Sequence, residues 1–273
     1  MPEFPCPKPI TVKIKLPGGT ADLYAEERDT AAVEVEPYDR SGAAAEAAER
    51  TVVELQGDTL IVEYPARSGW LPRLRDKVRI RVFVPLDSSV VATLASADLA
   101  CHCRFAAVNA KTASGSVSVE EVTGHLGVDT ASGDVHAGRV GRLETESASG
   151  DLRASRVGGD AKANSASGDV EIDELGGALT ANTASGDLRV GVARRGAIKV
   201  NTASGDVSVG VAAGTRTWLD LSSMSGSTTS DLAMTDAAGA PDSADTTETG
   251  LSVQVRTLSG DVRVHRAVTP ATT

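Results

Sequence analysis

Apolar and polar residues alternate with a period of two along most of this 273-residue chain. The alternation surrounds a short phrase, Thr/Ser-Ala-Ser-Gly-Asp followed by an aliphatic residue. Leu179 and Ala181 precede one copy of the phrase, and Leu188 and Val190 follow it. A period of two is typical of β-strands, and residues 94–211 show no sustained helical period. The pattern therefore predicts two short strands per repeat, with turns between them.

The phrase recurs at a nearly constant interval, which is the signature of a repeat architecture. Its glycines are Gly115, Gly133, Gly150, Gly168, Gly186, Gly205, Gly226 and Gly260, separated by 18, 17, 18, 18, 19, 21 and 34 residues. A degenerate copy of the phrase, LASADL at 94–99, has Ala97 in the glycine position, 18 residues before Gly115. The long final interval contains a polar, low-complexity segment at about 228–250, which predicts an inserted mobile loop.

The repeat length points to a stacked fold. Two strands and two turns use about 18 residues, and an isolated strand pair of that size cannot bury an apolar face. Coils that hydrogen-bond to their neighbours at about 4.8 Å spacing can do so. We therefore predict an all-β, stacked β-solenoid with about 18 residues per coil and nine coils, one for each copy of the phrase.

The residues of the phrase suit a corner of such a coil. Glycine permits a tight bend, and the adjacent aspartate accepts hydrogen bonds from nearby main-chain amides. The predicted turn ladder combines the glycines and Ala97 with Asp134, Asp151, Asp169, Asp187, Asp206 and Asp261. A column of inward hydroxyls is expected to form a hydrogen-bonded ladder: Thr112, Thr130, Ser147, Ser165, Thr183 and Thr202. An outward column, Asn164, Asn182 and Asn201, is expected to form a short side-chain ladder. The motif is explained without a ligand.

The N-terminal region also alternates, but without the phrase. Strands are expected at 10–16, 31–37, 51–65 and 77–85, and a short Ala-rich helix at 42–50 is preceded by Ser41 as its N-cap. A solenoid needs protection at its first open edge. We therefore expect residues 1–92 to be a β-rich cap or degenerate coils, residues 93–266 to be the solenoid, and residues 267–273 to be a flexible tail. GTADLYAEE at 19–27 resembles a worn phrase and favours degenerate coils.

A strand ending in VRIRVFVP, a Ser-Val-Val stretch and serial TASGDV units resemble the bacterial β-strand-repeat family called Toastrack. The resemblance covers about residues 8–266, and family members are commonly labelled adhesins or domains of unknown function. It implies a β-helix-like fold and a bacterial origin. Some relatives are linked to cell-envelope stress and to antimicrobial-peptide responses, often with membrane segments or regulatory domains that this chain lacks. The family brings no catalytic residues.

Composition and charge narrow the function. The net charge of −10 argues against nucleic acid and against an anionic membrane surface, because both require clustered Lys and Arg. Only 3% of residues are aromatic, so the core must be built from small aliphatic side chains in repeated layers. The chain shows neither a signal peptide nor a transmembrane segment, and its three cysteines fit a reducing compartment. These features predict a cytoplasmic location.

Three groups of residues could bind a metal or catalyse a reaction, but each also has a structural explanation. Cys101, His102 and Cys103 suggest a metal site, but alternation places the two cysteines on one strand face and His102 on the other, so buried core cysteines are preferred. The aspartate column suggests calcium, but the Gly-Gly-x-Gly-x-Asp signature of calcium-binding β-rolls is missing. The four histidines lie outside any hydrolase motif. We expect no catalytic residue, no cofactor and no metal.

These considerations predict a non-enzymatic scaffold or protein-interaction module, and the family resemblance implies adhesin-like binding or a link to cell-envelope stress. An unknown protein partner would bind a sheet face, a solenoid end or the 228–250 loop, and self-association through the solenoid ends is a further expectation. The alternative is a ligand-binding rod that takes calcium, a glycan or a cationic peptide along a repeated sheet face.

Overall fold

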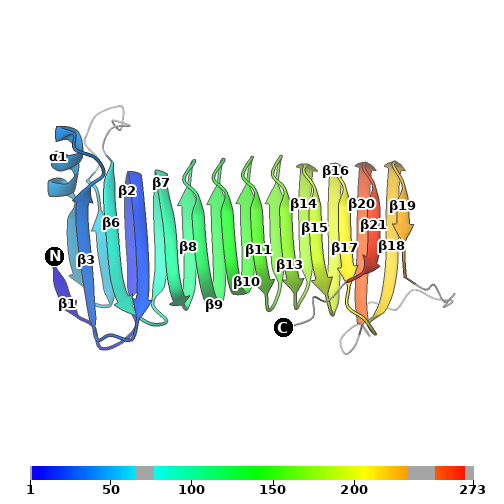
Figure 1. Ribbon diagram of the computed structural model, residues 1–273, viewed down its shortest axis with the longest axis horizontal. Coiled ribbons are helices and arrows are strands. Elements are labelled where there is room, and N and C mark those ends of the chain that lie inside the picture. Colours follow the sequence, from blue (N-terminus) through cyan, green and yellow to red (C-terminus); the bar gives the residue numbers. More distant parts are fainter. Residues whose placement is uncertain (1, 66–76, 233–249, 268–273) are drawn as a thin grey trace. The chain divides into compact units, whose positions relative to one another are not determined.

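The computed structural model describes residues 2–65, 77–232 and 250–267 (Figure 1). The chain divides into two compact units, residues 1–140 and 141–273, which are described in turn. In each unit, short strands from successive repeats lie side by side in parallel pairs. The predicted all-β, stacked β-solenoid is confirmed.

Unit 1 contains one helix and nine complete strands. They are β1 (Glu3–Pro5), β2 (Thr11–Glu26), β3 (Thr30–Pro37), α1 (Gly42–Arg50), β4 (Val52–Gln56), β5 (Thr59–Glu63), β6 (Val78–Pro85), β7 (Ser89–Phe105), β8 (Ala107–Thr112) and β9 (Val117–Thr130). The strand β10 (Val135–Ser147) begins in unit 1 and ends in unit 2. Parallel stacking already begins at β2, whose Gly19 lies opposite Ala97 of β7.

The N-terminal end of unit 1 changes from parallel to antiparallel pairing. β2 lies between β7 on one side and β5 and β6 on the other, all parallel to it. Beyond these, β4 pairs antiparallel with β5, β3 with β6, and β1 with β3. The helix α1 begins as predicted, because the Ser41 hydroxyl accepts the N–H of Ala44 at 3.2 Å, and its buried Ala44 and Ala47 identify the inward face.

Unit 2 continues the repeats with β11 (Leu152–Val157), β12 (Ala161–Ser165), β13 (Val170–Leu175), β14 (Leu179–Ser185), β15 (Leu188–Ala193), β16 (Gly196–Ser204), β17 (Val207–Val211), β18 (Arg216–Ser225), β19 (Thr228–Ser230), β20 (Gly250–Ser259) and β21 (Val262–Arg266). Equivalent residues of neighbouring repeats pair in register, for example Ala163 with Ala181 and Ala181 with Val200.

The last two coils do not follow the order of the sequence. β20 pairs with β16 on one edge and with β18 on the other, and β21 lies between β17 and β19 in the same way (Figure 1). At this end, therefore, the coils do not stack in the order in which they occur in the sequence. The reason is burial: Val253 and Val255 of β20 are fully buried, whereas Leu219 and Leu221 of β18 are half-buried, so the strand with the more regular apolar face takes the interior place.

The core between the two sheets consists of small and medium aliphatic side chains, as the low aromatic content predicts. Val170, Ile172 and Leu175 of β13 pair in register with Leu152, Ala154 and Val157 of β11, and each of these six residues is at most 5% exposed. Among the described residues, Phe105 is the largest fully buried side chain. Most of the predicted 228–250 loop and all but the first residue of the predicted tail lie outside the described residues. The division at residue 92 stays a prediction.

Candidate functional site

Four hydroxyls of the repeated phrase bond within their own turns, whereas the buried hydroxyls of Thr183 and Thr202 have no hydrogen-bond partner among the described residues. Thr112 accepts the N–H of Gly115 at 2.9 Å, and Ser165 accepts the N–H of Gly168 at 2.8 Å. Thr130 and Ser147 do the same in their turns. The expected hydroxyl ladder from coil to coil is therefore wrong, because the amide three residues ahead is nearer than the next hydroxyl.

The glycines lie directly over main-chain atoms of the adjacent coil. A methyl group on Gly115 would lie 1.8 Å from the carbonyl oxygen of Ala97, and one on Gly168 would lie 2.0 Å from that of Gly150. The same close approach recurs at Gly133, Gly186, Gly205, Gly226 and Gly260. These distances are far below van der Waals contact, so a side chain at this corner would separate the coils.

The aspartates form a ladder along unit 2. Each main-chain N–H donates to the carboxylate of the preceding coil: Asp169 to Asp151 at 3.0 Å, Asp187 to Asp169 at 2.9 Å, Asp206 to Asp187 at 2.9 Å and Asp261 to Asp206 at 2.8 Å. Asp261 in turn accepts the N–H and hydroxyl of Ser227, and these bonds lower the pKa of its carboxyl. In unit 1, Asp98 accepts the N–H of Ser116, and the main-chain oxygen of Asp134 accepts the N–H of Val117.

The outward columns are solvated and of mixed sign. Asn201 donates to Asn182 at 3.0 Å, and Asn182 to Asn164 at 2.9 Å, which confirms the side-chain ladder. Lys162 pairs with Glu144 at 2.8 Å, and Arg156 pairs with Glu174 at 2.7 Å. Exposed ion pairs of this kind contribute little to stability.

The Cys-His-Cys segment differs from its prediction. Cys101 is buried, and burial raises the pKa of its thiol, but Cys103 is exposed and has a φ of 67°. The register of β7 against β9 shifts between Cys101 and Arg104, so a bulge turns Cys103 outward and breaks the alternation. Buried placement of Cys103 is therefore wrong. The bulge is held by Glu120, which accepts the Cys103 N–H at 2.7 Å and contacts His102 Nδ1 at 3.1 Å.

A shallow groove of about 180 Å³ follows the aspartate ladder in unit 2. It is lined by Asp151, Leu152, Arg153, Asp169, Val170, Glu171, Asp187 and Arg189. Arginines and carboxylates alternate along its length, and each ladder aspartate already accepts a main-chain N–H. In the part of the chain that the structure describes, no three His, Cys, Asp or Glu side chains group as metal ligands do.

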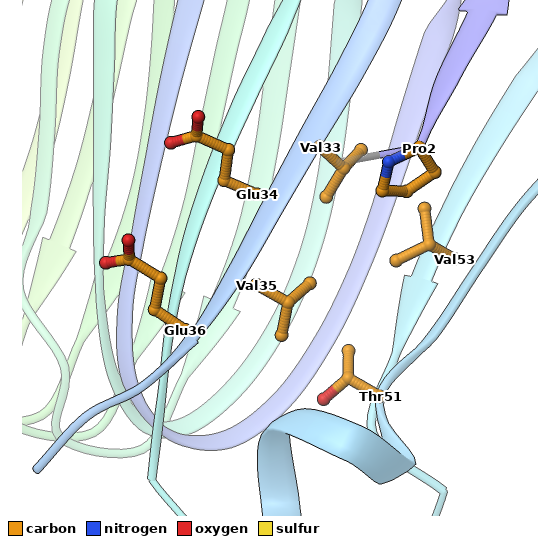
Figure 2. A pocket seen from close by; sticks show the side chains of 7 residues that line it. All are labelled: Pro2, Val33, Glu34, Val35, Glu36, Thr51 and Val53. Atoms are coloured by element: carbon orange, nitrogen blue, oxygen red, sulfur yellow. The ribbon is translucent and has the colours of Figure 1, made fainter. Parts of the chain in front are cut away.

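A larger cleft of about 500 Å³ opens at the N-terminal end of unit 1 (Figure 2). It is lined by Pro2, which precedes β1, by Val33, Glu34, Val35 and Glu36 of β3, by Thr51 at the C-cap of α1, and by Val53 of β4. Figure 2 shows Val33 and Val35 on the side of β3 toward Val53, and the two glutamates on the opposite side. Val33 is buried, whereas Val35 and Val53 are half-buried, so apolar surface is accessible here.

Sequence reasoning did not find this cleft, because it depends on which strand edges remain unpaired after folding. A signal was nevertheless present in AAVEVEP at 31–37, where valine and glutamate alternate. Such a strand has one apolar face and one acidic face. Its pairing partners, however, lie far away in the sequence.

Comparison with known proteins agrees with the repeat geometry. The family model of Toastrack DUF4097 matches residues 12–265. The chain belongs to the Toastrack family. This confirms the resemblance that the repeat phrase suggested, and the match spans both units.

Solved structures with similar folds include "putative adhesin" proteins from Bacteroides fragilis and Parabacteroides merdae. The first is 12% identical with a TM-score of 0.46, covering 96% of this chain and 95% of that chain. The second is 11% identical with a TM-score of 0.36, covering 96% and 94%. A "putative cell adhesion protein" from Clostridium sporogenes is 7% identical with a TM-score of 0.22, covering 97% and 99%. The comparison with curated proteins found no match.

The helix α1 is too short to cross a lipid bilayer. At nine residues, α1 is shorter than a membrane-spanning helix, and no helix among the described ranges meets the length and hydropathy that a span requires.

Proposed function

We propose that this Toastrack chain is a non-catalytic protein-interaction module of adhesin-like type, which binds its partner in the cleft between β3 and β4. The observation that carries the proposal is the cleft itself, which combines accessible apolar walls with a strand edge. Pockets of 300–1,000 Å³ with apolar walls are typical of binding sites, and this cleft falls within that range.

The repeated phrase supports the same conclusion by a different route. Its glycines allow neighbouring coils to approach, and its aspartates and hydroxyls bond to main-chain amides. These hydrogen bonds give the polar groups of the corner a structural role that needs no ligand. The corners therefore serve stacking, and recognition is left to the ends and outward faces.

Affinity capture with matched variants tests the proposal. Val53→Arg places a charge inside the cleft, whereas Val91→Arg makes the same change at an exposed valine of β7. We expect the wild type and Val91→Arg to retain the same partner and Val53→Arg to lose it. A partner that Val53→Arg retains in full would place the binding surface elsewhere and contradict the proposal.

The second candidate is a ligand-binding module that uses a repeated face, and the groove along the aspartate ladder favours it. Calcium is the simplest test, because it prefers carboxylate oxygens. Under the interaction-module proposal, calorimetry of the full chain with calcium shows no saturable heat. Saturable binding that Asp169→Ala and Asp187→Ala abolish would favour the second candidate. A cytoplasmic location and self-association stay predictions.

A further inference from the structure

The outer edge of β3 is only partly covered. β1 pairs with the first part of β3, and the last bond of this pairing runs from the N–H of Val33 to the carbonyl oxygen of Pro2 at 3.1 Å. N–H and C=O groups point to alternate sides along a strand, so those of Val35 point to the same side as those of Val33. No described residue pairs with Val35 on that side. Pro2 has no N–H to offer the carbonyl of Val33.

The cleft continues this free edge inward. A strand added beside Val35 would place every second side chain toward the space in front of Val53, since side chains alternate between the two faces. Val35 and Val53 are half-buried and would be covered by such a side chain. Aliphatic residues therefore fit the inward positions of the added strand.

The opposite face of β3 is acidic. Arg81 pairs with both Glu34 and Glu36, with guanidinium nitrogens 3.1 Å and 3.5 Å from their carboxylates. Arg79, the cross-strand partner of Glu36, instead lies over the ring of Tyr38. Two carboxylates facing one guanidinium leave negative charge beside the free edge. Opposite charges on cross-strand neighbours stabilise strand pairs, so Arg or Lys fits the outward positions.

The paired edge of β3 shows which sequence this strand accepts. In β6, Val82, Arg81, Ile80 and Arg79 lie opposite Val33, Glu34, Val35 and Glu36. Aliphatic residues thus meet the valines, and arginines meet the glutamates. A strand on the free edge, which begins beyond the Val33–Pro2 bond, faces Val35 and Glu36 and calls for the same alternation.

We propose that the cleft binds an extended peptide segment with alternating aliphatic and basic residues, which adds a strand to β3 in line with β1. This inference rests on the proposed function and names the chemistry of the partner. Main-chain bonds to Val35 hold the segment, the apolar cleft takes its aliphatic side chains, and Glu34 and Glu36 attract its basic ones.

Fluorescence anisotropy with three labelled peptides tests the proposal on the unmodified chain. VRIRVF carries the alternation, VEIEVF reverses its charge, and RRVVIF has the same composition without the alternation. We expect VRIRVF to bind at least tenfold more tightly than either control. Equal binding of VRIRVF and RRVVIF would show that charge attraction alone drives binding and that the alternation plays no part. That result, or no detectable binding of VRIRVF, would overturn the proposal.

Variants locate the binding on the chain. Val53→Arg and Thr51→Arg are expected to weaken VRIRVF binding at least tenfold, and Glu34→Gln with Glu36→Gln several-fold. Val91→Arg and Glu49→Gln, at exposed positions away from the cleft, are expected to leave it unchanged. Two separate cleft variants keep the test valid if one of them fails to fold. Equal weakening by the cleft variants and their controls would overturn the proposal.

Hydrogen exchange at Val35 gives a readout that needs no variant. The Val35 amide is expected to exchange freely in the unliganded chain and to slow at least tenfold with VRIRVF. Full protection without peptide would mean that another part of the chain or a second copy occupies the edge, and it would overturn the proposal. If capture depends on Val53 but VRIRVF does not bind, strand addition fails while the interaction module stands.

Discussion

The glycine of each corner determines how closely two coils approach. Its hydrogen faces a carbonyl oxygen of the next coil, and the shortfall for a methyl group at Gly168 is more than 1 Å relative to ordinary contact. The obstacle is main-chain rather than a flexible side chain. Relief therefore requires the whole coil to move.

Gly168→Ala is expected to lower the free energy of unfolding by about 1–3 kcal/mol, the usual cost of overpacking a well-packed interior. Urea denaturation followed by circular dichroism measures the change. Gly42→Ala is the control, because a methyl group there meets nothing within 4 Å. An equal effect of the two substitutions would refute the close approach.

Glu120 makes stability depend on pH. The N–H of Cys103 and the ring of His102 hold the pKa of its carboxyl below its ordinary value. A carboxyl whose pKa is lower in the folded state stabilises the fold at neutral pH, and this stabilisation is lost as the pH falls through the folded-state pKa. We expect Glu120→Gln to lower the melting temperature at pH 7.

Below about pH 4.5, the difference between Glu120→Gln and the wild type is expected to shrink as the native carboxyl becomes protonated. Melting temperatures measured from pH 7 to pH 3 give the profile. Glu49→Gln, at an exposed helix position, is the charge control. A difference that stays constant over this range would show that Glu120 does not act through its charge.

Residue-level prediction from the sequence was uneven for a physical reason. The phrase suggested that aspartate bonds to main-chain amides, but not that glycine lets adjacent coils approach, because that role depends on how the coils stack. The position of Cys103 depends on a bulge that interrupts the period of two. The hydroxyl of Thr112 accepts the N–H of Gly115 in its own turn and does not bond to a hydroxyl of the next coil. Neither outcome can be read from alternation alone.

At the scale of elements, the sequence predicted the positions of the strands well, but it predicted less well which strands lie next to each other. The helix at 42–50 and most strands of the N-terminal region were predicted, because caps and alternation are local signals. The strand β1 was not expected, and the strand expected at 51–65 is the antiparallel pair β4 and β5. The insertion of β20 between β16 and β18 was not, because it reflects competition between two strands for the same edge.

Engineered disulfides test this order. In a Cys103→Ser background, Ser208→Cys with Arg263→Cys is expected to form a disulfide, because the two positions are direct partners across β17 and β21. Ser208→Cys with Thr229→Cys is not expected to do so, because these positions are two coils, about 9.6 Å, apart. Non-reducing electrophoresis and peptide mapping detect the bond. A disulfide between positions 208 and 229, with none between 208 and 263, would show that the coils stack in the order of the sequence.

At the scale of the whole molecule, the family and fold were accessible from the repeat, whereas the candidate binding surface was not. An 18-residue period suffices to predict coils, but the cleft arises where parallel pairing gives way to antiparallel pairing. Its walls come from β3 and β4, which the sequence separates by a helix. The proposed recognition surface thus lies at the N-terminal end of unit 1 and not on the repeat.

Site-specific photo-crosslinking in living cells tests this central claim most directly. A photoreactive amino acid at Thr51 samples the cleft, and the same residue at Arg189 samples the groove along the aspartate ladder. The account predicts a discrete protein adduct from position 51 and none from position 189. An adduct from position 189 alone would contradict it and move recognition to the repeated face.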